Sequence, residues 1–545
     1  MLDSDESVEL SWKTCLLISA GIFAFVLGLF LLSFKTYFHG GESFEFCHYA
    51  EIADNILHGR GLSTVVHFPI FLAYFAHLGV RFSGAGPSVD RFVFFSYWSA
   101  LWSLIGGGGD FGMALGNGVA HALWVILLYW VGRWLFNERT ATISALLWTL
   151  NPMMLAGHDL FGYPDVLFGV FFGFLNVLYY QALCDSTLGT PRVYFGIGLL
   201  AGGAYLTRES FIFWLPLYLA SPLVVAGRRR WSCAAAFLLA FLIPWTVWAF
   251  HVGDKLGALN PQHFMQVLAK DTIGSHMPWA EYRVYTYSDF MTPGILGKFM
   301  HKFLSYLGLF MRNLPNLWLE ALLIPFAIAG MLTAPRPASG LATWLSLLFG
   351  WQLFVFSFLH YEYLSYMSGR YYLWFAPFII LYAVAFFERR CASRLWSLTA
   401  IVVLGYLLHY WVVGYRSIPR KSDHPSHQSI GSWPEIVYMR ENVPANAWIL
   451  TNIPAQLAWY GKRRAILIPI HTEDVPHLMK DWTVNYIFLS YHRIGELYNF
   501  TEWQRLLTES PNSLNEMMSG FGFKLEKTFD EGVLFRKVGT GVKPK

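Results

Sequence analysis

Much of this chain consists of apolar stretches that, as helices, are about long enough to cross a lipid bilayer. Polar segments separate them. A helix needs roughly 20 apolar residues to cross the hydrocarbon core of a membrane. Only 14% of the 545 residues are charged, against roughly 25% in soluble domains. We therefore expect a polytopic α-helical membrane protein with spans, some of them short and tilted, at about 14–34, 112–132, 141–156, 163–183, 193–206, 210–226, 232–251, 305–333, 341–360, 371–388 and 395–414.

Two further apolar stretches, 66–82 and 91–106, lie between the first and second of these spans. They are either juxtamembrane helices or a hairpin of two more spans. The chain then has 11 or 13 spans, and the orientation of the later spans is the same in both cases.

Arginine residues orient the bundle, because short loops rich in Lys and Arg stay in the cytoplasm. Alternate loops carry Arg133, Arg139, Arg192, Arg228, Arg229, Arg230, Arg336, Arg389, Arg390 and Arg394. The more varied polar segments share the opposite side, namely 42–69, 157–162, 252–303, 361–370 and everything beyond 415. We expect a multi-pass protein of the inner (plasma) membrane with these segments outside the cytoplasm.

The composition changes after the last span, so we expect a transmembrane domain at 1–415, a polar linker at 416–432 and a small extracytoplasmic α/β domain at 433–545. Within that last domain the pattern predicts a helix at 433–443 and a terminal hairpin at 522–538. Short buried strands are expected at 447–453, 465–470 and 485–492.

The segment after the first span opens with two carboxylates, Glu42 and Glu45. A helical pattern follows and ends at two glycines; its apolar positions are Tyr49, Ile52, Ala53, Ile56 and Leu57. Such a helix would hold carboxylates where the bilayer meets water, which is where a lipid-linked substrate presents its head group. Acids that merely face water are the plainer explanation.

Four other polar residues lie near the ends of spans on the same side of the membrane. Asp159 and Asp165 are functional candidates, because desolvating a carboxylate at the mouth of a span is costly; alternatively, Asp165 caps the next helix. Arg208 and Arg370 suit a phosphate group in bidentate fashion. Snorkelling, or ion pairs with Glu209 or Glu362, would also explain them.

The loop 252–303 carries Lys255, Lys270, Arg283 and many aromatic residues, so it is either a lid or a solvated loop. Five scattered cysteines and the absence of a His/Cys cluster at metal spacing predict no metal site. The small net charge of +4 gives no reason to expect a nucleic-acid partner.

Several motifs in order resemble the GT-C membrane glycosyltransferases, in the bacterial branch related to protein mannosyltransferases and to aminoarabinose and RgtA/B/C/D-like transferases. The second acidic loop GHDLFGYPD contains His158, Asp159 and Asp165. The other matching residues are Glu45, Tyr49, Ile52, Ala53, Asn55, Leu57, Gly59, Arg60, Gly61 and Pro69 of the first loop, Leu206, Thr207 and Arg208, Arg370, Tyr371 and Pro377, and Trp459, Tyr460, Gly461, Arg463 and Pro469.

The resemblance implies transfer of a sugar, with inversion, from a polyprenyl-phosphate donor to a glycolipid, surface polysaccharide or protein acceptor. It implies that 35–111 is the first catalytic loop and that Glu45 is the base. The family usually has Asp at this position, so Glu42 or Asp159 is an alternative. Asp159 or Asp165 would orient the acceptor or the base.

By the same resemblance, Arg208 and Arg370 would hold the donor phosphate, and Tyr49, Tyr371 and His158 would complete the substrate site. Neither a metal nor a cofactor is expected. Two other functions remain open. A lipid-linked-sugar transporter would favour internal repeats, which the sequence lacks. A polysaccharide polymerase or ligase would use residues such as His263 and His276 of the loop 252–303.

Overall fold

The computed structural model describes residues 11–41, 43–89, 91, 93–185, 187–225, 230–256, 262–317, 321–359, 368–391, 393–417, 429–491, 500–508 and 511–539. In this part of the chain, seven helices are long and apolar enough to cross a membrane. They are α1 (Trp12–Tyr37), α5 (Gly109–Leu135), α8 (Asp165–Cys184), α11 (Arg230–Leu256), α15 (Ala338–Leu359), the end of the 3-10 helix η8 (Ser368–Phe375) continued by α16 (Ala376–Arg390), and α17 (Arg394–Ser417).

The polytopic helical class is thus confirmed, whereas the total of 11 or 13 spans stays a prediction. Other apolar helices in the bundle are shorter or less apolar than those seven. They are α6 (Glu138–Thr149), α9 (Pro191–Thr207), η2 (Glu209–Trp214), α10 (Leu215–Val225), α13 (Ile295–Leu317) and α14 (Ile324–Leu332).

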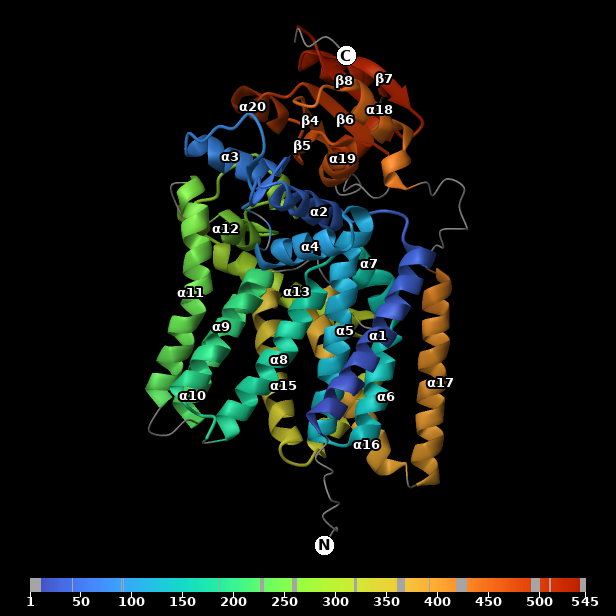
Figure 1. The fold of residues 1–545 in the computed structure, drawn as a ribbon. Helices are drawn as coiled ribbons and strands as arrows, with labels where there is room; N and C mark the ends of the chain where they lie inside the picture. The colour runs from blue at the N-terminus through green and yellow to red at the C-terminus, as the bar shows by residue number, and fades with distance from the viewer. Residues whose placement is uncertain are drawn as a thin grey trace.

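Burial separates the central helices from those at the edge of the bundle. In the apolar windows of α5 and of the η8–α16 segment, 78% of the residues are buried, against 11% in α1 and 18% in α17. Helices α1 and α17 run along the edge of the bundle (Figure 1). Because α5 is enclosed by other helices, its polar side chains must find partners inside the protein.

The stretch 305–333, predicted as one span, is not one continuous α-helix, because the 3-10 helix η6 (Ala321–Leu323) directly precedes α14. It falls on two helices, α13 ending at Leu317 and α14 beginning at Ile324. Pro325 stands in the first turn of α14, where its fixed φ and missing N–H favour the start of a helix. Apolar composition continues through the break, so the hydropathy pattern does not reveal it.

Three short helices lie across the end of the bundle, beneath the C-terminal domain: α2 (Phe44–Leu57), α3 (Pro69–His77) and α4 (Val93–Ile105) (Figure 1). At 1.5 Å per residue, α3 and α4 are about 14 and 20 Å long. Neither reaches across a core of about 30 Å. The stretches 66–82 and 91–106 therefore form juxtamembrane helices rather than a hairpin of two spans.

The C-terminal domain is built on a six-stranded sheet of order β2-β5-β4-β6-β8-β7. The strands β4 (Trp448–Thr451), β5 (Arg464–Leu467) and β6 (Tyr486–Ser490) are parallel, and β7 (Phe523–Phe529) and β8 (Gly532–Lys537) form the predicted hairpin. The flanking helices are α18 (Pro434–Asn442), α19 (Pro454–Gly461), α20 (Asp474–Asp481), α21 (Thr501–Thr508) and α22 (Pro511–Gly520).

One edge strand of this sheet comes from the first loop. Strand β2 (Val66–His67) pairs in parallel with β5, with Val66 opposite Ala465. A second, two-stranded sheet joins β1 (Ser63–Thr64) to β3 (Gly86–Pro87). The boundaries 1–415, 416–432 and 433–545 stay a prediction. The sheet itself, however, needs residues from both sides of the linker.

Part of the loop 252–303, from Met265 to Tyr285, is packed against the C-terminal domain, whereas Tyr287 and Met291 are exposed. It contains α12 (Gln262–Ala269), η4 (Pro278–Ala280) and η5 (Tyr287–Met291). Met265, Met277 and Tyr285 belong to the same buried cluster as Trp448 and Ile487. The backbone N–H of Ile470 donates to the carbonyl of Ala280 at 2.8 Å. The side chains of Lys255 and His263 lie outside the described part.

Candidate active site

The second acidic loop runs from the end of α6 to the start of α8. It forms a π-helical turn, η1 (Met154–His158), and one turn of α-helix, α7 (Asp159–Phe161). Asp159 is fully buried and its Oδ2 lies 2.8 Å from Nδ1 of His121 on α5. Burial raises the pKa of Asp159, and the neighbouring His121 acts against that rise. The pair places a carboxylate in a water-poor position at the mouth of α8.

The same face of α5 holds the backbone of this loop. The side-chain amide of Asn117 donates to the carbonyls of His158 at 3.0 Å and Tyr163 at 3.1 Å. Asn117 and His121 are one helical turn apart, so both point to the same side of α5. His158 is itself buried, with its ring 5.7 Å from that of Tyr163.

Asp165 and Arg208 form a buried ion pair. Asp165 is the first residue of α8 and accepts a hydrogen bond from Nη1 of Arg208. Arg208 stands where α9 ends, in extended backbone before η2. Its guanidinium carbon lies 4.5 Å from the ring centre of Tyr371 and 5.4 Å from that of Trp374. Three sequence candidates, Asp165, Arg208 and Tyr371, are thus brought together, and the pairing of Arg208 with Glu209 is not the one the structure selects.

The first acidic loop contacts the second one directly. Ser43 caps α2 and donates its hydroxyl to the carbonyl of Phe161 at 2.7 Å. Phe46 packs on Gly162, whose φ of +65° and close backbone approach leave no room for a Cβ atom. Glu45 lies between Ser43 and Phe46 in the first turn of α2 and is half-buried. Glu45 is therefore next to the loop that carries Asp159.

Two of the sequence candidates cannot be placed as side chains, since Glu42 and the side chain of Arg370 lie outside the described part. Tyr49 is fully buried inside the first loop, with its ring 4.7 Å from that of Phe95 in a T-shaped arrangement. Its role in substrate binding stays a prediction.

A buried carboxylate that the sequence analysis missed lies on α2. Glu51 accepts hydrogen bonds from Asn55 Nδ2 at 2.5 Å, from Thr64 Oγ1 at 2.7 Å and from the N–H of Val65 at 3.3 Å. Burial raises the pKa of Glu51 to about 7, and these hydrogen bonds act against the rise. The i, i+4 spacing of Glu51 and Asn55 was the available signal.

The hydrogen bonds continue from Thr64 toward a cation. His48 Nε2 lies 3.0 Å from Thr64 Oγ1, and Nε of Arg91 donates to His48 Nδ1 at 2.8 Å. Thr64 donates its proton to Glu51, so His48 must donate from Nε2 and accept at Nδ1. The pKa of His48 is well below its usual value because of burial and the charge of Arg91, which fits a neutral ring.

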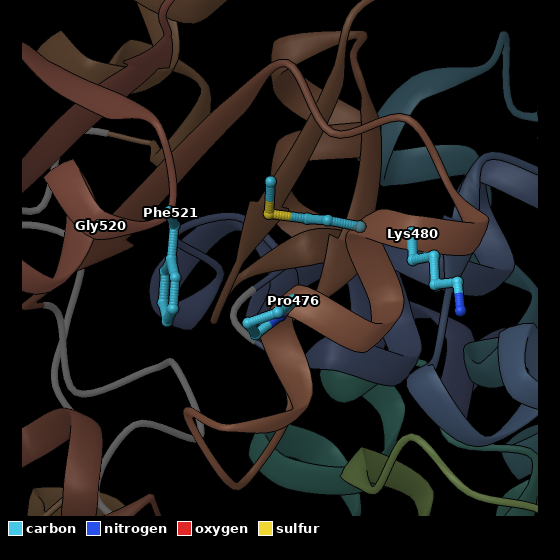
Figure 2. A pocket seen from close by; sticks show the side chains of 5 residues that line it. Pro476, Lys480, Gly520 and Phe521 are labelled. Carbon is cyan, nitrogen blue, oxygen red and sulfur yellow. The ribbon is translucent and has the colours of Figure 1, made fainter.

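Other parts of the described chain bring together fewer side chains that could bind a substrate or take part in a reaction. A hollow of about 270 Å³ on the C-terminal domain is lined by Pro476, Met479, Lys480, Gly520 and Phe521 (Figure 2). One lysine is the only charged group in that lining. Among the described residues, no three or more His, Cys, Asp and Glu side chains are grouped so that they could hold a metal ion.

Part of the chain matches a known protein family. Residues 90–248, which include His121, Asp159, Asp165 and Arg208, match the family described as dolichyl-phosphate-mannose-protein mannosyltransferase. A curated relative, undecaprenyl phosphate-alpha-4-amino-4-deoxy-L-arabinose arabinosyl transferase 2 of Pseudomonas fluorescens, is 23% identical over 212 residues. That match spans 34% of this chain and 36% of the relative.

Solved structures match over much more of the chain. ArnT from Cupriavidus metallidurans, bound to undecaprenyl phosphate, aligns over 98% of this chain and 100% of its own, with a TM-score of 0.56 and 11% identity. The archaeal oligosaccharyltransferase AglB from Archaeoglobus fulgidus, in complex with an inhibitory peptide and a dolichol-phosphate, aligns over 98% of this chain and 75% of its own, with a TM-score of 0.55 and 11% identity. The shared fold, together with the sequence matches over part of the chain, supports a GT-C superfamily membrane glycosyltransferase.

Proposed function

We propose that this protein transfers a sugar from a polyprenyl-phosphate-linked donor to an acceptor on the side of the membrane where the C-terminal domain lies. The acceptor is a glycolipid, a cell-surface polysaccharide or a protein. The membrane is the inner (plasma) membrane, and the C-terminal domain is outside the cytoplasm. The lipids named with the solved relatives, undecaprenyl phosphate and dolichol-phosphate, support this class of donor.

The observation that carries the proposal is the buried guanidinium of Arg208 between Asp165 and the rings of Tyr371 and Trp374. Asp165 uses Nη1 of Arg208, and Nε is a buried donor without an acceptor among the described residues. Leaving such a donor unmatched is costly. A phosphate oxygen is the acceptor that a guanidinium group matches best. We assign Asp165 the role of orienting Arg208, and Arg370 the role of a second phosphate ligand.

The chemistry is a single displacement at the anomeric carbon. The acceptor hydroxyl attacks this carbon and gives its proton to Glu45, while the bond from the carbon to the phosphate oxygen breaks. The lipid phosphate leaves with the electron pair, and the configuration inverts. Fixed positive charge from Arg208 stabilises the departing phosphate. Asp159, held by His121, orients the acceptor beside Glu45. Tyr371, which packs on Arg208, and Tyr49 and His158 of the two acidic loops complete the substrate site.

Neither a metal nor a cofactor is part of this proposal. The reaction involves no oxidation or reduction, and guanidinium groups can supply the charge that the departing phosphate requires. The lipid-linked sugar is a substrate.

The test is turnover by purified protein in liposomes that contain radiolabelled polyprenyl-phosphate sugars and candidate acceptors. Glu45→Gln keeps the shape of the side chain but removes its basicity, so kcat should fall about 100- to 10,000-fold. Arg208→Lys keeps the charge but loses the planar fork, so donor use should fall about 10-fold or more, as expected for a lost charge-assisted hydrogen bond. Glu441→Gln and Arg505→Lys change exposed residues of the C-terminal domain and should behave as wild type.

Other outcomes would favour other functions. Movement of labelled lipid across the bilayer without a new glycosidic bond would identify a transporter. Addition of a long polymer in one step would identify a polymerase or ligase. Full activity of Glu45→Gln would move the base to another residue, with Asp159 the next to substitute.

A further inference from the structure

Two aromatic residues of the C-terminal domain, Trp459 and Tyr460 on α19, are bonded to the transmembrane domain. Trp459 Nε1 donates to Oδ1 of Asp110 at 2.8 Å, and the hydroxyl of Tyr460 donates to Oδ2 of the same carboxylate at 2.9 Å. Asp110 is in the first turn of α5. Trp459 and Ala455 belong to the buried cluster of the helix bundle rather than to the core of their own domain.

The Tyr460 hydroxyl also reaches the backbone just before α2. It accepts a hydrogen bond from the N–H of Gly41 at 2.6 Å, and the carbonyl of Gly41 accepts one from Sγ of Cys47 at 2.9 Å. A Cβ atom at Gly41 would lie 2.3 Å from a ring carbon of Phe46, so this backbone sits directly on the first turn of α2. One hydroxyl therefore connects Asp110 of α5 to the start of the helix that carries Glu45.

We propose that Trp459 and Tyr460 are positioning residues that hold the start of α2, and with it Glu45, in the geometry that sugar transfer requires. The C-terminal domain thereby completes the active site. This inference rests on the proposed function, because it gives Glu45 the role assigned above. The contacts join residues about 350 and 420 positions apart in the chain, so only the docked C-terminal domain can supply them.

The hydroxyl group, rather than the ring, carries this role. Its oxygen accepts a hydrogen bond from the N–H of Gly41 while its O–H donates to Asp110, so the phenol satisfies a backbone donor and a half-buried carboxylate together. Phenylalanine keeps the ring that packs on Gly431 but can do neither. Removal of the hydroxyl then leaves both partners unsatisfied, and this shifts the start of α2 toward looser conformations by about tenfold or more.

The experiment compares Tyr460→Phe with Tyr438→Phe in the full-length protein. Tyr438 is on α18 of the same domain, and its hydroxyl contacts Glu526 at 3.5 Å, away from the first loop. Cys47, fully buried against Gly41, serves as the reporter in a background where Cys15, Cys184, Cys233 and Cys391 are replaced by alanine. We measure the rate of maleimide labelling of Cys47, and kcat and donor KM for sugar transfer.

Tyr460→Phe should label at Cys47 about tenfold faster than wild type and lose about tenfold in kcat, with donor KM within about twofold of wild type. Tyr438→Phe should match wild type in all three. Asp110→Asn replaces one of the two acceptor oxygens with an NH2 donor, so Trp459 and Tyr460 can no longer both donate to residue 110. It should act in the same direction, with effects that do not add in the double variant. Should Tyr460→Phe fail to fold, Asp110→Asn decides the question.

Unchanged labelling of Cys47 in both variants overturns the inference. Faster labelling with unchanged kcat also overturns it, because α2 would then be loosened without consequence for transfer. The labelling arm does not depend on turnover. If wild-type protein transfers no sugar, the proposed function fails, and the labelling rates still show whether the hydroxyl of Tyr460 holds the first loop.

Discussion

At the scale of single residues, a group of polar side chains inside the first loop forms hydrogen bonds with one another. Arg91, His48, Thr64 and Glu51 form a continuous series of donors and acceptors, and Asn55 ties Glu51 to the carbonyl of Ser63 at 2.8 Å. Arg60 in turn donates to Asn55 at 2.7 Å. The motif residues Asn55 and Arg60 therefore act on the structure of the loop.

The raised pKa of Glu51 makes the stability of the protein depend on pH. In the folded protein the pKa is about 7, against an ordinary value of 4.5. Between these values the unfolded chain loses its proton while the folded protein keeps it, so stability falls as pH rises through this range and then levels off. Glu51→Gln removes this term, which is worth at most roughly 3 kcal/mol.

The measurement is thermal unfolding in detergent at pH 5 and pH 8. The Tm of Glu51→Gln relative to wild type should increase between pH 5 and pH 8. The exposed Glu441→Gln should track wild type at both values. If the Tm difference between Glu51→Gln and wild type is the same at pH 5 and pH 8, Glu51 is already ionised in the folded protein at pH 5.

At the scale of elements, the candidate site depends on how closely α2 packs on the turn between α7 and α8. Gly162 is in the left-handed region and lies against Phe46, while Ser43 bonds to Phe161. The π-helical turn η1 precedes this contact, and π-helical turns are frequent at functional sites. The two acidic loops can approach one another only because residue 162 has no side chain.

Gly162→Ala tests this contact. The new methyl group would lie 2.8 Å from Phe46 Cδ2 and 3.2 Å from Phe46 Cα, at a φ of +65°. Steric strain and overpacking together should cost about 2–4 kcal/mol, seen as a lower Tm, and transfer activity should fall with it. Gly157→Ala is the matched control, because nothing lies within 4 Å of its Cβ position. Equal stability of the two variants would mean that α2 can move away without cost.

At the scale of the whole molecule, the bundle has two chemically different ends. The C-terminal domain and the short helices α2, α3 and α4 cover one end, and the turn between α16 and α17 lies at the other (Figure 1). Arg389, Arg390 and Arg394 are in or beside that turn. Charge therefore predicts that this turn is cytoplasmic and the C-terminal domain is not.

Single cysteines in a cysteine-free background test this orientation. Ser429→Cys, before α18, and Ser393→Cys, before α17, are both at exposed positions. An impermeant maleimide added to intact spheroplasts should label the cysteine at 429 and leave the one at 393 unlabelled until the membrane is opened. The reverse labelling pattern would show that the protein has the opposite orientation in the membrane. Transfer would then occur on the opposite side.

Local pattern by itself determined the class of the protein. Whether a side chain meets water, lipid or the protein interior sets the pattern of apolar and polar residues, and this pattern repeats every few residues. It was enough to predict the spans, the terminal hairpin and the strands at 448–451, 464–467 and 486–490. Local pattern did not predict which of the candidate residues contact one another. Asp165 and Arg208 were each chosen from the sequence, but the ion pair between them appeared only once α8 and α9 were packed.

Tertiary structure alone decided the contacts that complete the site. His121 and Asp159 are 38 residues apart, and Trp459 and Asp110 are 349 apart. The two-residue strand β2 joins the sheet of the C-terminal domain although it is too short to leave a periodic pattern. The physical reason is that burial makes partners compulsory for polar groups without specifying which partners they take. That choice is made by the packing of helices and strands from distant parts of the chain.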